Sequence, residues 1–328
     1  MKKTLVAVAA LAISTAAIAR DQIQIVGSST VYPFATVVAE TFGRSSGFKA
    51  PIIESTGSGG GLKMFCKGVG VDTPDITNAS RKIKQSEVDR CAKNGVTPVE
   101  RLIGFDGIAF ANSKEAPQFT LTREEIYLAV AKQVPAKKVG FMTGLLNGGD
   151  TMVDNPFTHW NQINSKLPNQ EIKVLAPPPT SGTRDAFVEL VMHKTCKKKY
   201  GMPKKGADGY KAQCSALRED GHVTEVGEND NVIIHKLKID PNNFGIFGFS
   251  FLDNNRDTVQ GSVVDGAAIE FETIADGSYP ISRPLYYYMK KEHIGQIPGM
   301  EEYDAMFKKM VEPEGRLEEM GLIPAPEK

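Results

Sequence analysis

Three consecutive prolines, Pro177 to Pro179, stand directly before a Thr-Ser-Gly-Thr run. Proline fixes its own backbone angle and has no N–H to donate, so this approach can neither continue a helix nor lie inside a sheet. Thr180 or Ser181 is a natural cap for a helix that begins at once, because a hydroxyl can accept from the first-turn amides. Apolar residues then recur at helical spacing through Val191. The stretch therefore predicts a rigid loop that leads into a capped helix.

The first turn of this helix has the makeup of an oxyanion site. It offers backbone N–H groups, the hydroxyls of Ser181 and Thr183, close backbone approach at Gly182, and the guanidinium of Arg184. The amino end of a helix carries partial positive charge and free N–H groups, which attract anions. An ordinary capped helix start has the same composition, so this stretch alone does not separate the two interpretations.

The chain repeats this device twice. Residues 27–34 read GSSTVYPF and residues 55–65 read STGSGGGLKMF, each between a short apolar strand pattern and a helical pattern. Hydroxyl-rich and glycine-rich helix starts at three places suggest that several helix amino ends converge on one anion. The candidate donors here are Ser29, Thr30, the backbone at Val31, and Ser58.

Strand and helix patterns alternate along the first third of the chain, which favours an α/β fold with a parallel sheet and sites at the carboxyl ends of its strands. Strands are expected at 23–26, 50–54 and 75–79, and helices at 34–42, 62–67 and 82–94. Further on, 172–175 and 243–251 are expected as strands and 302–320 as an amphipathic helix.

Two longer strand patterns, 102–112 and 279–289, bracket a middle segment of the chain. They predict a discontinuous lobe formed by residues 20–104 plus 280–328 and an inserted lobe formed by residues 105–279. Two strands that cross between the lobes would form a hinge, with the ligand in the cleft between the lobes.

The first 19 residues have the pattern of a secretory signal. Lys2 and Lys3 form a basic start, residues 5–13 an apolar middle, and Ala17-Ile18-Ala19 a small-residue cleavage site. The apolar run is too short for a membrane span. We expect a mature chain that begins at Arg20, is exported to the periplasm and is not inserted in the membrane.

The 39 basic and 39 acidic residues balance, so no broad basic field is available for nucleic acid. An anion would have to bind in a local pocket. The five histidines and the cysteines do not stand at metal-ligand spacing, and neither a metal site nor a cofactor is expected.

Cys66, Cys91, Cys196 and Cys214 are the four cysteines, and in an exported chain we expect disulfides. Four cysteines allow three connectivities. The local pairs Cys66–Cys91 and Cys196–Cys214 are the favoured ones.

Five motifs carry a family likeness when they are read in order. They are GSSTVYPF, STGSGGG, NASRKI, PTSGTRDAF and SYPISRPLYYY, and they span essentially the whole mature chain. In this set the chain resembles the periplasmic phosphate-binding proteins of ABC importers, which have a type II solute-binding fold. The resemblance implies capture of inorganic phosphate and its delivery to a permease driven by an ATPase. We expect the protein to act as a monomer.

The resemblance implies that Thr30 and the backbone after it, Ser58, and the Ser181–Thr183 run donate to the anion. Two departures from the family pattern stand out. Where the family has an aspartate at the end of the third strand, this chain reads Ala79-Ser80-Arg81. Where the family has an arginine four residues before the serine, this chain has Pro177. Arg184 is interpreted as the replacement cation, with Arg81 as a second one.

Asp106 interrupts the apolar run LIGFDGIAF, where a carboxylate is costly without a partner. Our hypothesis is that Asp106 takes over the role of the missing aspartate and accepts a hydrogen bond from protonated phosphate. The alternative is a structural aspartate that caps backbone groups at the hinge.

Three other functions stay open at this point. The first is binding of another oxyanion, such as sulfate, molybdate or an organophosphate, on the same fold. The second is a secreted phosphatase-like hydrolase, although no G-x-S-x-G motif is present and the segment GSGGGLKM lacks the G-K-[ST] ending of a nucleotide phosphate loop. The third is a surface or adhesion role. The preferred prediction is a binding protein without catalysis.

Overall fold

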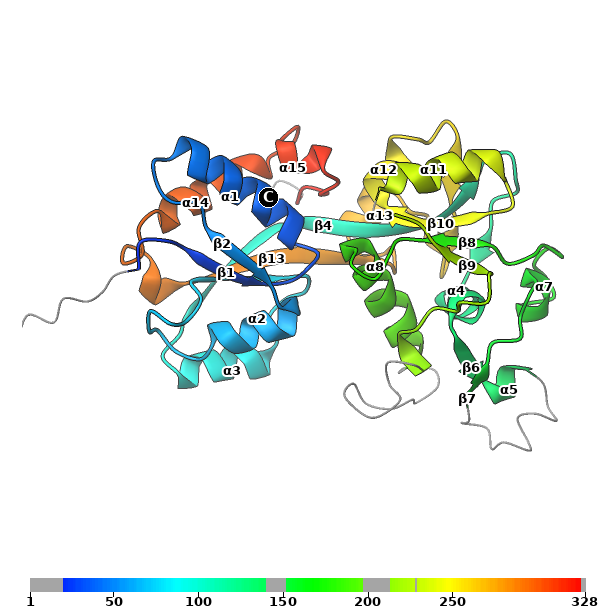
Figure 1. Cartoon of the computed structure of the whole chain (residues 1–328), viewed down its shortest axis with the longest axis horizontal. Helices are drawn as coiled ribbons and strands as arrows, with labels where there is room; N and C mark the ends of the chain where they lie inside the picture. Colours follow the sequence, from blue (N-terminus) through cyan, green and yellow to red (C-terminus); the bar gives the residue numbers. More distant parts are fainter. Residues whose placement is uncertain (1–19, 140–151, 197–212, 228, 326–328) are drawn as a thin grey trace, which may run out of the picture.

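The fold is described from a computed structural model, in which residues 20–139, 152–196, 213–227 and 229–325 are placed (Figure 1). The predicted signal, residues 1–19, lies outside the described residues. None of the helices in these ranges is long and apolar enough to cross a bilayer.

The amino-terminal third alternates strands and helices, as predicted. Its elements are β1 (Gln24–Gly27), α1 (Tyr32–Ser45), β2 (Ile52–Ser55), α2 (Gly57–Phe65), β3 (Ile76–Ala79) and α3 (Gln85–Lys93). The strands β2, β1 and β3 pair in parallel in this order. Their carboxyl ends therefore lie at one edge of the sheet, where the loops to α1 and α2 begin.

Two strands connect the two parts of the molecule. The sixteen-residue β4 (Pro98–Ser113) pairs with β13 (Ser282–Lys290) up to Gly107 and with β10 (Phe244–Gly248) from Ile108 onward. The strand β13 is antiparallel to both β3 and β4, so the sheet is mixed rather than purely parallel. Figure 1 shows β4 and β13 running from the group around β1 to the group around β10. This is the predicted pair of connecting strands.

The second part of the sheet has the order β4, β10, β8, β9, with the last three parallel to each other. The elements of this part are β5 (Thr120–Leu121), α4 (Arg123–Val130), β6 (Gln133–Pro135), α5 (Ala136–Val139), β7 (Met152–Asp154), α7 (Trp160–Ile163), β8 (Val174–Ala176), α8 (Gly182–Phe187), the π-helix η1 (Val188–His193), β9 (Val223–Glu225), α11 (Asp230–Ile239), α12 (Phe249–Asp253), β11 (Val259–Gly261), β12 (Val263–Val264) and α13 (Phe271–Ala275).

Two element predictions are wrong in part. The expected strand at 243–251 stops at Gly248, because the chain turns there into α12, which begins at Phe249. The expected helix at 302–320 is divided into α14 (Met300–Met310) and α15 (Arg316–Glu319), and the short 3₁₀ helix η2 (Lys291–His293) precedes them. Pro313 stands between α14 and α15, where its missing N–H and fixed φ interrupt a helix.

The apolar core follows the same division. One cluster packs around β10 and contains Trp160 and Phe244, whose ring centroids lie 5.1 Å apart. Another packs α1 and α14 against the sheet around Phe42 and Tyr303. Each side thus buries its own apolar surface, which is the main source of stability for a compact unit. The lobe boundaries themselves stay a prediction.

Both favoured disulfide pairs are confirmed. Cys66 is bonded to Cys91 and Cys196 to Cys214. Each bond closes a short loop and so lowers the entropy of the unfolded chain, in the chain-entropy account of disulfide stabilisation.

Candidate functional site

Residues from both sides of the connecting strands line a single cavity of about 660 Å³. Six of the ten sequence-predicted ligand residues are in its lining: Ser29, Thr30, Asp106, Ser181, Gly182 and Thr183. The loop after β1, the strand β4 and the start of α8 are thereby brought together.

The loop after β1 is held in place by backbone contacts. Gly27 has a φ of 133°, and a Cβ there would lie 2.1 Å from the carbonyl oxygen of Asn78. Only glycine fits this position. The amide of Ser28 donates to the same carbonyl at 2.9 Å, and the amide of Tyr32 donates to Ser28 O at 3.0 Å. The strand end therefore turns at once into α1 and presents the hydroxyls of residues 28–30.

The predicted cap at the start of α8 is present. Ser181 is the N-cap residue, and its Oγ accepts a hydrogen bond from the amide of Thr183 at 3.2 Å. Because that oxygen is the acceptor, the hydroxyl proton of Ser181 is free to be donated elsewhere.

The two hydroxyl-bearing loops touch across the cavity. A Cβ placed on Gly182 would lie 3.3 Å from the Cα of Thr30, which is tighter than ordinary contact. The Oγ of Ser29 donates to Asp185 Oδ2 at 2.6 Å. These contacts join the start of α1 to the start of α8.

Arg283, which sequence reasoning missed, lies behind this contact. The register of β4 and β13 places it opposite Asp106, and its Nε donates to Asp106 Oδ2 at 3.4 Å. Its Nη1 donates to Glu189 Oε2 at 3.1 Å and its Nη2 to the Oγ1 of Thr30. The arginine side chain is 5% exposed, so this is a buried ion pair. The sequence signal for Arg283 is an arginine inside the apolar motif SYPISRPLYYY. A buried arginine requires an acceptor, just as the buried Asp106 requires a donor.

Asp230 was also missed. It is the first residue of α11, is 6% exposed, and is in the cavity lining together with Asp106. Burial raises the pKa of Asp230 to about 6, and the negative charge of Asp106 acts in the same direction, against a hydrogen bond from the amide of Gly248. Burial likewise raises the pKa of Asp106, and Arg283 opposes that shift.

Ser58 and Arg81 are not in the cavity lining. The Oγ of Ser58 lies 3.1 Å from the Oγ of Ser80 and accepts from the amide of Ser80 at 3.0 Å. Arg81 donates both terminal nitrogens to Glu87, each at 2.8 Å. The hydrogen bond to Glu87 raises the pKa of Arg81. This pairing supports the start of α3.

Arg184 and Val31 are also absent from the lining. The guanidinium of Arg184 donates to the carbonyl of Pro177 at 2.8 Å and to Glu225 Oε1 at 3.1 Å. It therefore holds the proline loop against β9. Val31 is fully buried and is the N-cap residue of α1, without a side-chain cap.

The charged residues in the described lining are both carboxylates, Asp106 and Asp230. The remaining polar residues of the lining carry hydroxyl groups. A fully ionised anion would be repelled by carboxylates, whereas an anion with bound protons can donate to them. Among the described residues no cluster of three metal-binding side chains is found.

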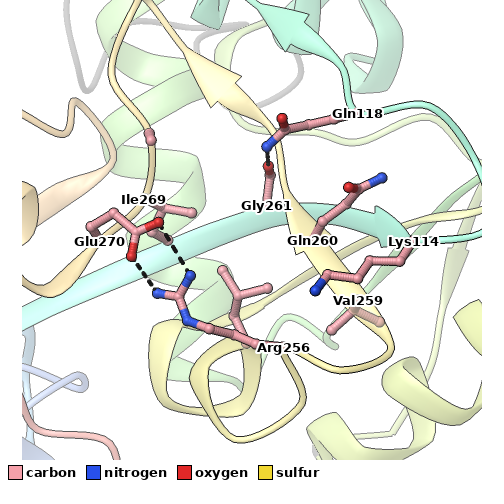
Figure 2. A pocket seen from close by; sticks show the side chains of 10 residues that line it. Lys114, Gln118, Arg256, Val259, Gln260, Gly261, Ile269 and Glu270 are labelled. Atoms are coloured by element: carbon pink, nitrogen blue, oxygen red, sulfur yellow. Dashed lines mark hydrogen bonds and ion pairs between the residues drawn. The ribbon is translucent and has the colours of Figure 1, made fainter.

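A second, smaller cavity of about 210 Å³ lies beside β11 and contains none of the predicted residues. In Figure 2 Arg256 is paired with Glu270, and Gln118 donates to the carbonyl of Gly261. The larger cavity is therefore the candidate site.

Comparisons with known proteins agree with this geometry. Protein SphX from Synechocystis sp. is 29% identical over 314 residues, which cover 94% of this chain and 79% of SphX. The phosphate-binding protein PstS from Staphylococcus saprophyticus is 28% identical and covers 92% of this chain and 80% of its own length. These similarities confirm the resemblance to phosphate-binding proteins that the motifs predicted.

Solved structures show the same fold. A possible phosphate-binding protein from Planctomyces limnophilus has a TM-score of 0.71 at 22% identity and covers 93% of both chains. An ABC-type phosphate transport receptor from Vibrio cholerae has a TM-score of 0.59 at 22% identity and covers 92% of this chain and all of its own. The predicted α/β fold of the type II binding proteins is confirmed. Residues 12–307 match the sequence model of the PBP superfamily domain, and the chain belongs to that superfamily.

Proposed function

We propose that this protein is an exported solute-binding protein that captures inorganic phosphate between two lobes and delivers it to an ABC transporter permease. The observation that carries the proposal is the lining of the larger cavity, where hydroxyl donors from two parts of the chain face two carboxylates. The names of the relatives point to the same ligand.

The carboxylates give a reason for phosphate rather than sulfate. At neutral pH phosphate carries a proton and sulfate does not. Asp106 accepts a hydrogen bond from the protonated oxygen, and its lone pairs repel a fully ionised tetrahedral anion. The hydroxyls of Thr30 and Ser181 donate to the other oxygens.

The remaining predicted residues fit the proposal in two ways. Arg184 shapes the Ser181–Thr183 loop through its bonds to Pro177 and Glu225. Ser58 and Arg81 follow the strands β2 and β3 at the edge of the same sheet but lie outside the lining, so a contact with the anion would require their side chains to move. Arg81 would then have to leave Glu87.

Calorimetric titration of the mature chain with phosphate, arsenate and sulfate tests the ligand. We expect phosphate and arsenate to bind and sulfate to bind at least a hundredfold more weakly, a difference of about 2.7 kcal/mol. Equal affinity for sulfate contradicts the proposal.

The proposal also excludes catalysis. The purified protein should not turn over a chromogenic phosphate ester, and stimulation of a reconstituted permease–ATPase complex by the phosphate-loaded protein tests the delivery step. Light scattering on the purified protein should give the mass of a monomer.

A further inference from the structure

We propose that Arg283 is a positioning residue that sets the anion specificity of this site. Its guanidinium holds Thr30 as a hydrogen-bond donor and Asp106 as an acceptor toward one protonated oxyanion. The inference rests on the proposed phosphate site and adds a residue that acts on the ligand only through its neighbours.

The contact with Thr30 fixes the role of that hydroxyl. A guanidinium has N–H donors and no acceptor, so the Oγ1 of Thr30 must accept from Nη2 of Arg283. The single hydroxyl proton is then free to be donated. Thr30 is 6% exposed and is in the cavity lining, so the cavity is where that proton can find an acceptor.

The contact with Asp106 fixes the opposite role. Nε of Arg283 bonds only Oδ2, and within the described part of the chain Oδ1 has no hydrogen-bond partner. Burial favours the neutral form of this carboxyl and the guanidinium favours the charged form. Without the guanidinium a protonated Asp106 would donate a hydrogen bond and would no longer reject sulfate.

Glu189 explains why Arg283 acts indirectly. Its carboxylate, half-exposed on η1, accepts from Nη1 at 3.1 Å. The three bonds direct the guanidinium at Asp106, Glu189 and Thr30, and Arg283 is not in the cavity lining, so it acts on the ligand through its neighbours. The charged groups around Asp106 are Arg283 on β13, which bonds it directly, Asp230 on α11, and Glu189 on η1, which shares Arg283 with it.

A purely structural tie between β4 and β13 gives a different expectation. Loss of such a tie would lower stability and weaken all anions alike. A positioning role changes the ratio of phosphate affinity to sulfate affinity, and it makes that ratio depend on pH.

The experiment compares the parent chain with Arg283→Gln by calorimetry, using inorganic phosphate and sulfate between pH 5.5 and 8.5. We expect phosphate to bind at least tenfold more weakly to the variant and the phosphate-to-sulfate affinity ratio to fall at least tenfold. As the pH is lowered, the affinity ratio should begin to fall at a higher pH in the variant than in the parent. The reason is that Asp106 without the guanidinium takes up its proton at a higher pH. Arg256→Gln is the matched control, since Arg256 also bonds two carboxylates, Asp253 and Glu270, but lies at the other cavity (Figure 2).

A folded Arg283→Gln chain whose ratio stays within twofold of the parent overturns the inference. If that variant does not unfold cooperatively, Arg283→Lys takes its place, because the donors of a single ammonium nitrogen do not span the acceptors that three separate guanidinium nitrogens reach. An unchanged ratio in Arg283→Lys has the same meaning. When Arg283→Gln is added to the Asp106→Asn variant, the phosphate-to-sulfate affinity ratio should change little. Arg283 sets this ratio through the Asp106 carboxylate, which that variant already lacks. A parent chain that does not bind phosphate overturns the proposed function instead.

Discussion

The two ends of β13 both carry a buried cation, but their surroundings differ. At the carboxyl end, Lys290 donates to the carbonyl of Gly68 at 2.6 Å and to Thr73 Oγ1 at 2.7 Å. Close by, Asp75 is fully buried, and one of its oxygens lies 2.6 Å from His293 Nδ1. At the amino end, Arg283 is shared among Thr30, Asp106 and Glu189.

The difference lies in how completely the oxygens of the two buried carboxylates, Asp75 and Asp106, are satisfied. At the carboxyl end Asp75 also accepts from the amide of Gln24 at 2.7 Å and from Arg20 at 2.5 Å. All of these partners belong to the part of the molecule that contains β1. At the amino end, Asp106 keeps an unpaired oxygen and is in the lining of a cavity. A buried carboxylate with donors on both oxygens stabilises a fold, whereas one with an open oxygen beside a cavity can take a ligand.

Asp75→Ala should have the largest effect on stability. It leaves the amide of Gln24 and the side chains of Arg20 and His293 without their buried acceptor, which we expect to lower the free energy of unfolding by roughly 3–5 kcal/mol. Urea unfolding measures this loss. Asp21→Ala, at an exposed pair with Lys49, is the control. A loss below about 1 kcal/mol would break the contrast between the two ends.

Asp230→Asn should remove a pH dependence of stability. The pKa of Asp230 in the folded chain is about 6, above the ordinary 3.8, so the native state keeps a proton that the unfolded state releases. Stability therefore falls as pH rises from about 4 to 6, by roughly 3 kcal/mol from this group.

The measurement is the difference in unfolding free energy between the parent and Asp230→Asn at pH 4, 5, 6 and 7. The unfolding free energy of the variant relative to that of the parent should increase from pH 4 to pH 6 and should stay at that value at pH 7. The exposed Glu301→Gln serves as the control. A difference that does not vary with pH would show that Asp230 is not held in an unfavourable ionised state.

Gly182→Ala should separate the two loops slightly. Its Cβ would lie 3.3 Å from the Cα of Thr30 and 3.5 Å from the carbonyl oxygen of Ser29, and backbone atoms yield less easily than side chains. We expect phosphate to bind about tenfold more weakly, which corresponds to about 1.4 kcal/mol. Gly227→Ala, where a Cβ meets nothing within 4 Å, should bind normally. Equal affinities for the two variants would mean that the loop contact is not part of the site.

Ser29→Ala should have the smallest effect. The hydroxyl proton of Ser29 is already donated to the exposed Asp185, so its loss should weaken phosphate binding by only about threefold, or less than about 1 kcal/mol. Thr30→Val should weaken phosphate binding clearly more, because the hydroxyl proton of Thr30 is free to be donated to the anion. Calorimetry on the pair ranks the two hydroxyls, and the reverse order would contradict the roles assigned here.

Much of the fold follows from local signals. Short apolar runs before glycine and hydroxyl residues correctly predicted β1 and β3, and the Ser181 cap was visible in the Thr-Ser-Gly-Thr run. The errors occur where local pattern conflicts with chain geometry. The aromatic run after Gly248 continues a strand pattern, but it forms α12.

The candidate site was predictable only where its residues carry such local signals. Asp106 was noticed because a carboxylate in an apolar strand needs a partner, but its partner Arg283 is 177 residues away. Asp230 begins an ordinary-looking helix, so nothing in its neighbourhood marked it. Arg81 and Arg184 attracted attention by their position in motifs, and the structure pairs both with carboxylates.

By itself the sequence determined the alternating elements, the cap of α8 and the oxyanion-like composition of three loops, and it favoured the local disulfides, because each depends on residues close together in the chain. The tertiary structure alone decided which of those loops meet and which charges are paired. The reason is physical: strand register and burial set the distances between residues that are far apart in the chain, and those distances decide whether a charge is satisfied or left facing a cavity.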